Sequence, residues 1–158
     1  MMPELSVTHS TFVIERHYPA TPERVFRAFS DPAKKRRWLG EGEGREVLEF
    51  ESDFRVGGHE RTQSRLGANT PFPGTSLTNH TVYQDIVPNQ RIVFAYTMSL
   101  GDHRMSAALV TVQLTPANDG TAFTFTEQGA FFEGSDGPQR REAGWSKLLD
   151  GICAELSR

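Results

Sequence analysis

Cysteine is almost absent from this chain, because Cys153 is the only one among 158 residues. A single cysteine cannot form an internal disulfide, and a lack of disulfides is typical of reducing compartments. Residues 1–11 also lack the basic and then apolar pattern of a secretory signal peptide. We therefore expect a cytoplasmic protein.

Long hydrophobic runs and an excess of charge are also missing. No apolar stretch approaches the roughly 20 residues that a membrane-spanning helix needs. The chain has 17 basic and 20 acidic residues, which gives a formal net charge of -3. This balance provides no long-range attraction to nucleic-acid phosphates or to anionic lipid. We expect neither nucleic acid nor a membrane as a partner.

Recognisable catalytic and metal-binding motifs are lacking as well. The five histidines are scattered without paired spacing, so we predict no metal site and no cofactor. Segments 74–78 and 134–137 do not match the G-x-S-x-G pattern of a nucleophile elbow. The glycines of 40–44 follow a predicted helix, whereas a dinucleotide-binding loop follows a strand. The basic run 34–37 is interpreted as a solvated helix face, with anion docking as the alternative.

The clearest pattern in the sequence lies in its last twenty residues. Apolar residues recur there at the three- and four-residue spacing of one helix face. These residues are Trp145, Leu148, Leu149, Ile152, Cys153 and Leu156. The pattern predicts one long amphipathic helix from near Pro138 to near Leu156, with Cys153 as an inert packing residue.

The N-terminal part of the chain predicts one strand and two short helices. Thr11–Tyr18 alternates between a mostly apolar face and a more polar one, which indicates a strand. Thr21–Pro22 supplies an N-cap followed by a proline in the first turn, and Asp31–Pro32 repeats this helix start. Gly40, Gly42 and Gly44 are expected to end the second helix.

The middle of the chain predicts a series of hairpins. Six strand-like runs are separated mostly by turn residues. They cover residues 46–51, 54–65, 79–86, 91–98, 104–114 and 121–128. The order of strand, two short helices, hairpins and long helix predicts an α+β fold, an antiparallel sheet with helices on one side. Without an internal repeat or linker, residues 1–158 are expected to form one domain.

Several short blocks occur in the order of a known superfamily from about residue 12 to the end. They are Arg16–Pro22, Val25–Phe29, Asp31–Pro32 with Trp38, Asp53–Gly58, Asp85–Val93, Gly120–Thr121, Thr126–Phe132 and Gly144–Leu149. In this order they resemble the SRPBCC superfamily, in the branch named after the activator of the heat-shock chaperone ATPase. The resemblance implies a helix-grip fold, a curved antiparallel sheet wrapped around the C-terminal helix with a hydrophobic cavity between them. Members include binding proteins, cyclases and a eukaryotic co-chaperone, so the fold alone does not select a function.

The cavity that this fold implies would be lined by the inner face of the sheet and by the long helix. The candidate ligand-binding residues are Arg16, Tyr83, Phe94, Tyr96, Met98, Glu127, Phe131, Trp145, Leu149 and Ile152. Aromatic and methionine side chains make adaptable apolar walls, although each of them could simply fill the core. Phe131 and Phe132, just before the long helix, and Phe72, in the Pro-rich loop, are candidate gates, or else they pin a loop to the body of the protein. Gly144 and Gly151 lie on one flank of the helix, where either a ligand or the sheet approaches the backbone.

Arg16 and Glu127 are the charged residues that share parity with apolar neighbours. The helix-grip topology makes the first and last strands adjacent, so we predict a buried ion pair between these two side chains. A role in binding or catalysis is the alternative. Tyr83 could orient the polar end of a ligand or satisfy a hydrogen bond of the core.

The leading functional hypothesis is a carrier or sensor that binds a small, largely apolar molecule. One alternative is a lyase, cyclase or hydrolase that uses the same cavity, with Glu127, Arg16 or Tyr83 supplying acid, base or oxyanion help. A third hypothesis is a protein-interaction module similar to the chaperone ATPase activator. A homodimer is an open alternative for the assembly state.

Overall fold

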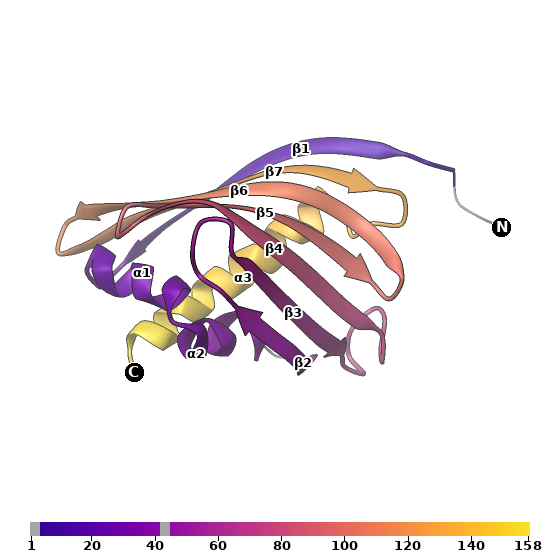
Figure 1. Cartoon of the computed structure of the whole chain (residues 1–158), viewed down its shortest axis with the longest axis horizontal. Helices are drawn as coiled ribbons and strands as arrows, with labels where there is room; N and C mark the ends of the chain where they lie inside the picture. Colours follow the sequence, from indigo (N-terminus) through magenta and orange to yellow (C-terminus); the bar gives the residue numbers. More distant parts are fainter. Residues whose placement is uncertain (1–3, 42–44) are drawn as a thin grey trace.

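A computed structural model describes residues 4–41 and 45–158. The elements are, in chain order, β1 (Val7–Tyr18), α1 (Pro22–Ser30), α2 (Pro32–Lys35), a π-helical turn (Arg36–Gly40), β2 (Arg45–Ser52), β3 (His59–Leu66), β4 (Ser76–Val87), β5 (Arg91–Leu100), β6 (His103–Ala117), β7 (Gly120–Phe132) and α3 (Pro138–Leu156). Within these ranges the strands form one antiparallel sheet in the order β1-β7-β6-β5-β4-β3-β2. The sheet curves over α3, and α1 and α2 lie on the same side (Figure 1). The predicted α+β helix-grip fold is confirmed.

The two predicted helix starts are confirmed by their caps. The Thr21 hydroxyl accepts a hydrogen bond from the Arg24 amide at 3.3 Å, and the Asp31 carboxylate accepts one from the Ala33 amide at 3.0 Å. A proline occupies the first turn in both helices. Each cap satisfies an amide that would otherwise lack a partner, which fixes where α1 and α2 begin.

The predicted end of the second helix falls partly outside the described residues, since Gly42 and Gly44 are not among them. Helix α2 continues into the π-helical turn, which ends at Gly40. The Trp38 indole donates a hydrogen bond to the carbonyl of Ala28 at 2.8 Å. This bond fastens the π-helical turn to α1.

Helix α3 has the predicted bounds, and its inner face is buried. Trp145 is 8% exposed, and Leu149 and Ile152 are fully buried. The expectation that Cys153 packs in the core is wrong, because this side chain is exposed. The buried stripe follows positions 145, 149 and 152, and the next residue is turned by about 100° around the helix axis, away from the sheet.

The first and last strands are longer than the sequence predicts. β1 begins at Val7 and pairs with β7 along its whole length, with Val7 opposite Phe132. β7 therefore extends past Gln128, and Phe131 belongs to the strand and not to a loop before α3. This pairing includes residues 7–10 and 129–132, which the sequence did not assign to strands. Their backbone N–H and C=O groups find partners in the sheet.

Candidate functional site

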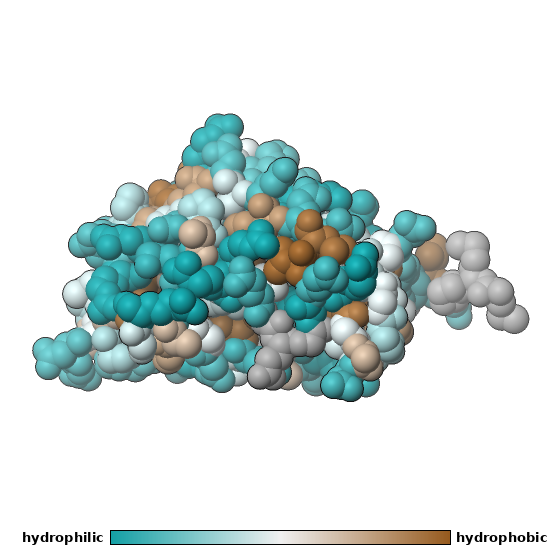
Figure 2. Space-filling view, turned by 90° about the horizontal axis from the view of Figure 1, so that it is seen from below, coloured by the Kyte–Doolittle hydropathy of each residue, from teal (hydrophilic) through white to brown (hydrophobic). Residues whose placement is uncertain are grey.

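A cavity of about 310 Å³ lies between α3 and the part of the sheet formed by β3 to β6. Its apolar lining consists of Leu39, Leu66, Pro71, Phe72, Leu77, Met98, Leu100, Met105, Trp145 and Leu148. Its remaining lining consists of Arg45, Asn79, Gly134, Ser135, Asp136, Arg140, Arg141 and Gly144. Seen from the helix side, the molecule carries a prominent hydrophobic patch on a largely hydrophilic face (Figure 2).

Strand register brings the floor of the cavity together. In the pairing of β4 with β5, Asn79 lies opposite Met98 and Leu77 lies opposite Leu100. Because alternate residues of a strand share one face, these four side chains form a continuous surface beneath α3.

The two glycines of α3 have different surroundings. A Cβ atom added at Gly144 would meet no atom within 4 Å, so the missing side chain leaves open space in the cavity. A Cβ atom at Gly151 would lie 3.8 Å from the Cβ of Trp38, an ordinary packing contact. The two glycines are seven residues apart and so share one flank of α3, as expected, but only Gly144 lines the cavity. Gly151 faces Trp38 and not a ligand space or the sheet.

A smaller space of about 20 Å³ lies next to the cavity. The two spaces share Leu39, Asn79 and Trp145, and polar groups from Glu60 and Tyr96 line the smaller one. The Asn79 side-chain oxygen is buried and has no hydrogen-bond partner among the described residues. Since a water needs roughly 10–15 Å³ of such space, the smaller space has room for about one water or one small polar group.

Tyr96 is the centre of a buried polar network beside this cavity. Its hydroxyl donates a hydrogen bond to Glu127 and accepts one from Arg141 Nη1 and one from Trp145 Nε1, each at 3.0 Å. Arg141 also donates two bonds to the Asp136 carboxylate, at 2.8 and 2.9 Å. The network therefore ties the first half of α3 to β5 and β7.

The ionisation of this network is controlled by burial. Burial raises the pKa of Glu127, although the hydrogen bond from Tyr96 and the charge of Arg141 oppose the shift. Burial and the nearby Glu127 carboxylate raise the pKa of Tyr96, so its hydroxyl stays neutral at physiological pH. One Glu127 oxygen has no hydrogen-bond partner within residues 4–41 and 45–158. Tyr96 and Glu127 can together hold a proton. Glu127, however, lines neither the cavity nor the smaller space.

A second buried polar cluster lies beside the smaller space. Lys35 Nζ lies 2.9 Å from both Glu60 oxygens and 2.9 Å from the Tyr83 hydroxyl, and that hydroxyl donates to Glu60 at 2.8 Å. Burial alone would lower the pKa of Lys35, but the Glu60 carboxylate reverses this and raises it. Burial raises the pKa of Tyr83 to about 12. The cluster therefore consists of a charged lysine, a carboxylate and a neutral tyrosine.

Lys35 and Glu60 were missed from the sequence. Lys35 belongs to the basic run 34–37, for which a solvated face was expected. Glu60 shares the buried face of β3 with Thr62 and Ser64, and this face has too few apolar residues to be recognised. Residues of β3 alternate between two polar faces, and this alternation indicates a strand. It does not indicate which of the two faces is buried against the core.

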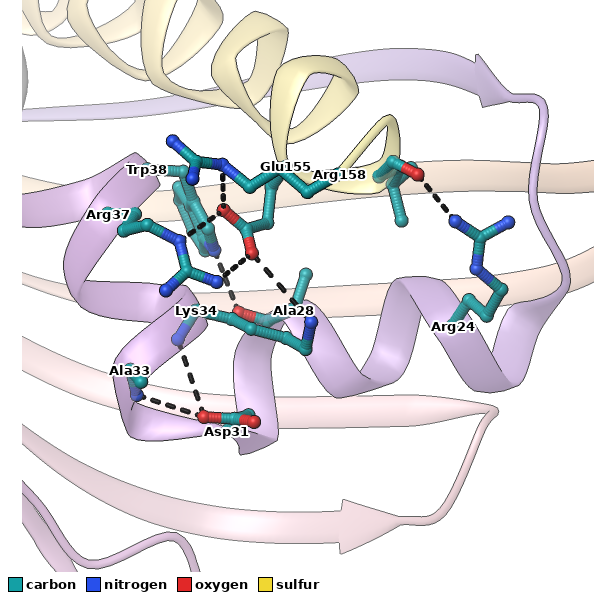
Figure 3. A network of polar contacts seen from close by, with 10 residues as sticks. Arg24, Ala28, Asp31, Ala33, Lys34, Arg37, Trp38, Glu155 and Arg158 are labelled. Carbon is teal, nitrogen blue, oxygen red and sulfur yellow. Dashed lines mark hydrogen bonds and ion pairs between the residues drawn. The ribbon is translucent and has the colours of Figure 1, made fainter.

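Arg36 is exposed as expected of a solvated face, but Lys34 and Arg37 differ from this expectation. Lys34 and Arg37 approach the buried Glu155 carboxylate near the end of α3, at 3.8 Å and 2.9 Å respectively (Figure 3). Arg158 contacts the same carboxylate at 3.5 Å. These ion pairs fasten the C-terminal end of α3 to α2 and to the π-helical turn.

Four of the predicted ligand-binding residues reach the two spaces. Met98 and Trp145 line the larger cavity, and Phe94, Tyr96 and Trp145 line the smaller space. They come from β5 and α3, the two elements that the sequence placed on either side of a cavity.

Five other predicted residues lie behind the walls. Tyr83 and Glu127 belong to the two polar clusters. Phe131 packs beneath Arg141, with 5.0 Å between the guanidinium carbon and the ring centroid. Leu149 and Ile152 are core residues under α3.

The predicted ion pair between Arg16 and Glu127 is wrong. β1 and β7 are neighbours as expected, but Arg16 lies opposite Phe123, whereas Glu127 lies opposite Phe12. Arg16 reaches α3 instead, with its Nε 3.1 Å from the Asp150 carboxylate. Parity along the strand was inferred correctly, but parity does not determine register.

Within residues 4–41 and 45–158, no helix is long and apolar enough to cross a membrane. The same residues contain no group of three or more His, Cys, Asp or Glu side chains that could hold a metal ion.

The curved sheet gripping α3, with a cavity between them, defines an SRPBCC-type helix-grip protein. The chain belongs to the family described as activator of Hsp90 ATPase homolog 1-like protein, whose sequence pattern matches residues 19–157. No match was found among curated proteins.

Solved structures support this assignment. The Mll3558 protein from Rhizobium loti is 51% identical, with a TM-score of 0.83 over 95% of this chain and 99% of that chain. An uncharacterised protein from Rhizobium leguminosarum is 40% identical, with a TM-score of 0.89 over 99% of both chains. An AHSA1-like protein from Aeromonas hydrophila shares the fold alone, at 19% identity and a TM-score of 0.66 over 94% of this chain and 92% of that chain.

Proposed function

We propose that the protein is a cytoplasmic carrier or sensor that binds one small, largely apolar molecule between α3 and the sheet. The cavity of about 310 Å³ falls at the lower end of the roughly 300–1,000 Å³ that ligand pockets occupy. Its walls are mainly leucine, methionine and aromatic side chains with a few polar groups. This composition is typical of sites that bind an apolar body and orient it through one or two polar contacts.

The observation that carries the proposal is the combination, in the larger cavity, of open space at Gly144 and a buried polar atom in the lining. Protein interiors are normally closely packed, and buried polar atoms normally have partners. Here the lining includes Asn79, whose side-chain oxygen has no hydrogen-bond partner among the described residues. A ligand that fills this space and donates a hydrogen bond to Asn79 would remove both defects.

Binding is tested with N-phenyl-1-naphthylamine, a neutral apolar fluorophore. We expect binding near one-to-one and quenching of Trp145 emission, measured in a Trp38→Phe background so that Trp145 is the only emitting tryptophan. Trp145 lines both spaces, so a probe in either would contact it.

Two glycine variants show whether the probe is in the cavity. Gly144→Leu should abolish binding because the new side chain enters the open space. Gly151→Ala is the matched control, since its Cβ makes only an ordinary contact with Trp38. Equal binding by both variants, with both folded by circular dichroism, would show that the probe binds elsewhere and would contradict the proposal.

A further inference from the structure

The lining of the cavity has an excess of positive charge. Its ionisable lining residues are Arg45, Asp136, Arg140 and Arg141. Asp136 is already neutralised by its two hydrogen bonds with Arg141. Within residues 4–41 and 45–158, Arg45 and Arg140 make no ion pair. Among these residues, two cations of a mainly apolar cavity therefore have no carboxylate partner.

Arg45 is the more informative of the two. It is the first residue of β2, lies opposite Leu66 of β3 and is partly buried. Burial lowers the pKa of its guanidinium, which means that its charge is partly removed from water without compensation. A partly desolvated cation without a partner is unfavourable, and an anion would relieve this cost.

Arg140 is the second cation of the lining, and its exposed side chain places it at the solvent-facing mouth of the cavity. It lies in the first turn of α3, whereas Arg45 comes from the edge strand β2. Its side chain is exposed and can move toward a ligand. Guanidinium groups present several N–H donors in a planar fork that matches carboxylate, sulfonate or phosphate oxygens.

We infer that the ligand is an amphiphilic anion, with an apolar body inside the cavity and one acidic group at the mouth between Arg45 and Arg140. This inference rests on the proposed binding function and adds the chemical class of the ligand. The apolar body would lie over Met98 and beside Trp145, and the acidic group would remain near solvent.

The test compares two probes with the same aromatic body. 8-Anilinonaphthalene-1-sulfonate is N-phenyl-1-naphthylamine with an added sulfonate. We expect the two probes to compete for one site, and the sulfonate to bind more tightly by about tenfold, as for a charge-assisted hydrogen bond. Arg45→Met should weaken sulfonate binding by about tenfold, which removes its advantage over the neutral probe. Binding of the neutral probe should not change. Arg140→Met should weaken sulfonate binding by about threefold, because its charge is exposed.

Arg65→Met is the matched control for the lost charge. Arg65 lies on β3 and pairs with Glu46 at 3.2 Å, but it does not line the cavity. If Arg65→Met weakens sulfonate binding as much as Arg45→Met does, the effect is a general one of net charge and the inferred site is wrong. If Arg45→Met does not fold, Arg45→Lys replaces it, and we expect weaker sulfonate binding because the planar fork is lost.

The probes separate this inference from the proposed function. If the neutral probe does not bind, the proposed function fails. If the neutral probe binds, but the sulfonate binds no more tightly and is insensitive to both arginine substitutions, the proposed function stands and the anionic ligand is excluded.

Discussion

Removing the positive charge of Lys35 should destabilise the fold severely. Its ammonium group is buried and is surrounded by the rings of Phe29, Tyr83 and Phe94, with their centroids 5.4 to 5.9 Å from Nζ. Lys35→Met preserves most of the side-chain volume but leaves the buried Glu60 carboxylate without a cation. Breaking a buried pair from one side costs about 3–5 kcal/mol of unfolding free energy.

The double variant Lys35→Met/Glu60→Leu isolates the cause of that loss. It removes both charges, so no uncompensated ion remains in the core, and the hydroxyls of Tyr83 and of the partly buried Ser52 lose their acceptor. An unsatisfied buried hydroxyl costs about 1–3 kcal/mol. We therefore expect the double variant to be no less stable than Lys35→Met, because the second substitution removes the stranded carboxylate.

Urea denaturation followed by tryptophan fluorescence measures these differences. Lys34→Met is the matched control because Lys34 is partly exposed, and Arg37 continues to pair with Glu155 after its removal. Its cost should be under about 1 kcal/mol. If Lys35→Met costs no more than Lys34→Met, the reasoning is refuted. It is also refuted if the losses from Lys35→Met and Glu60→Leu simply add in the double variant.

Three further predictions concern α3 and the network beside it. Leu149→Ala should lower the unfolding free energy by about 2–5 kcal/mol in urea titration, because Leu149 is fully buried. Gly144→Ala should raise it by about 0.5–1 kcal/mol through helix propensity, since the added Cβ meets no atom within 4 Å. Burial raises the pKa of Glu127, so its contribution to stability is full at low pH and is lost as the pH rises through that pKa. Glu127→Gln should remove this fall between pH of about 4 and about 8, and an unchanged pH profile would contradict the assignment.

The fold could be predicted from the sequence because its signals are local. The apolar spacing of Trp145, Leu149 and Ile152 determines both the length of α3 and the side that it buries. The capping residues Thr21 and Asp31 mark the starts of α1 and α2. Such patterns depend on residues a few positions apart, so they can be read without knowing the tertiary structure.

The polar parts of the site depend on contacts between distant residues, so they could not be predicted. Lys35 and Glu60 are 25 positions apart, and only the folded chain brings them together. Arg16 and Glu127 were expected to meet because their parity was right, but parity does not determine which residues face each other across two strands. The place of Arg45 in the cavity lining likewise depends on where the edge strand β2 lies in the folded sheet.

The two tryptophans provide the most direct test of the proposal that the cavity binds a ligand. Trp145 Nε1–H donates to Tyr96 at the cavity wall, whereas Trp38 Nε1–H donates to the carbonyl of Ala28 and does not line the cavity. In a ¹H–¹⁵N spectrum titrated with N-phenyl-1-naphthylamine, the Trp145 indole signal should shift and saturate at one equivalent while the Trp38 signal stays in place. A saturating shift of Trp38 alone, or no change in either signal at saturating probe, would contradict binding between α3 and the sheet.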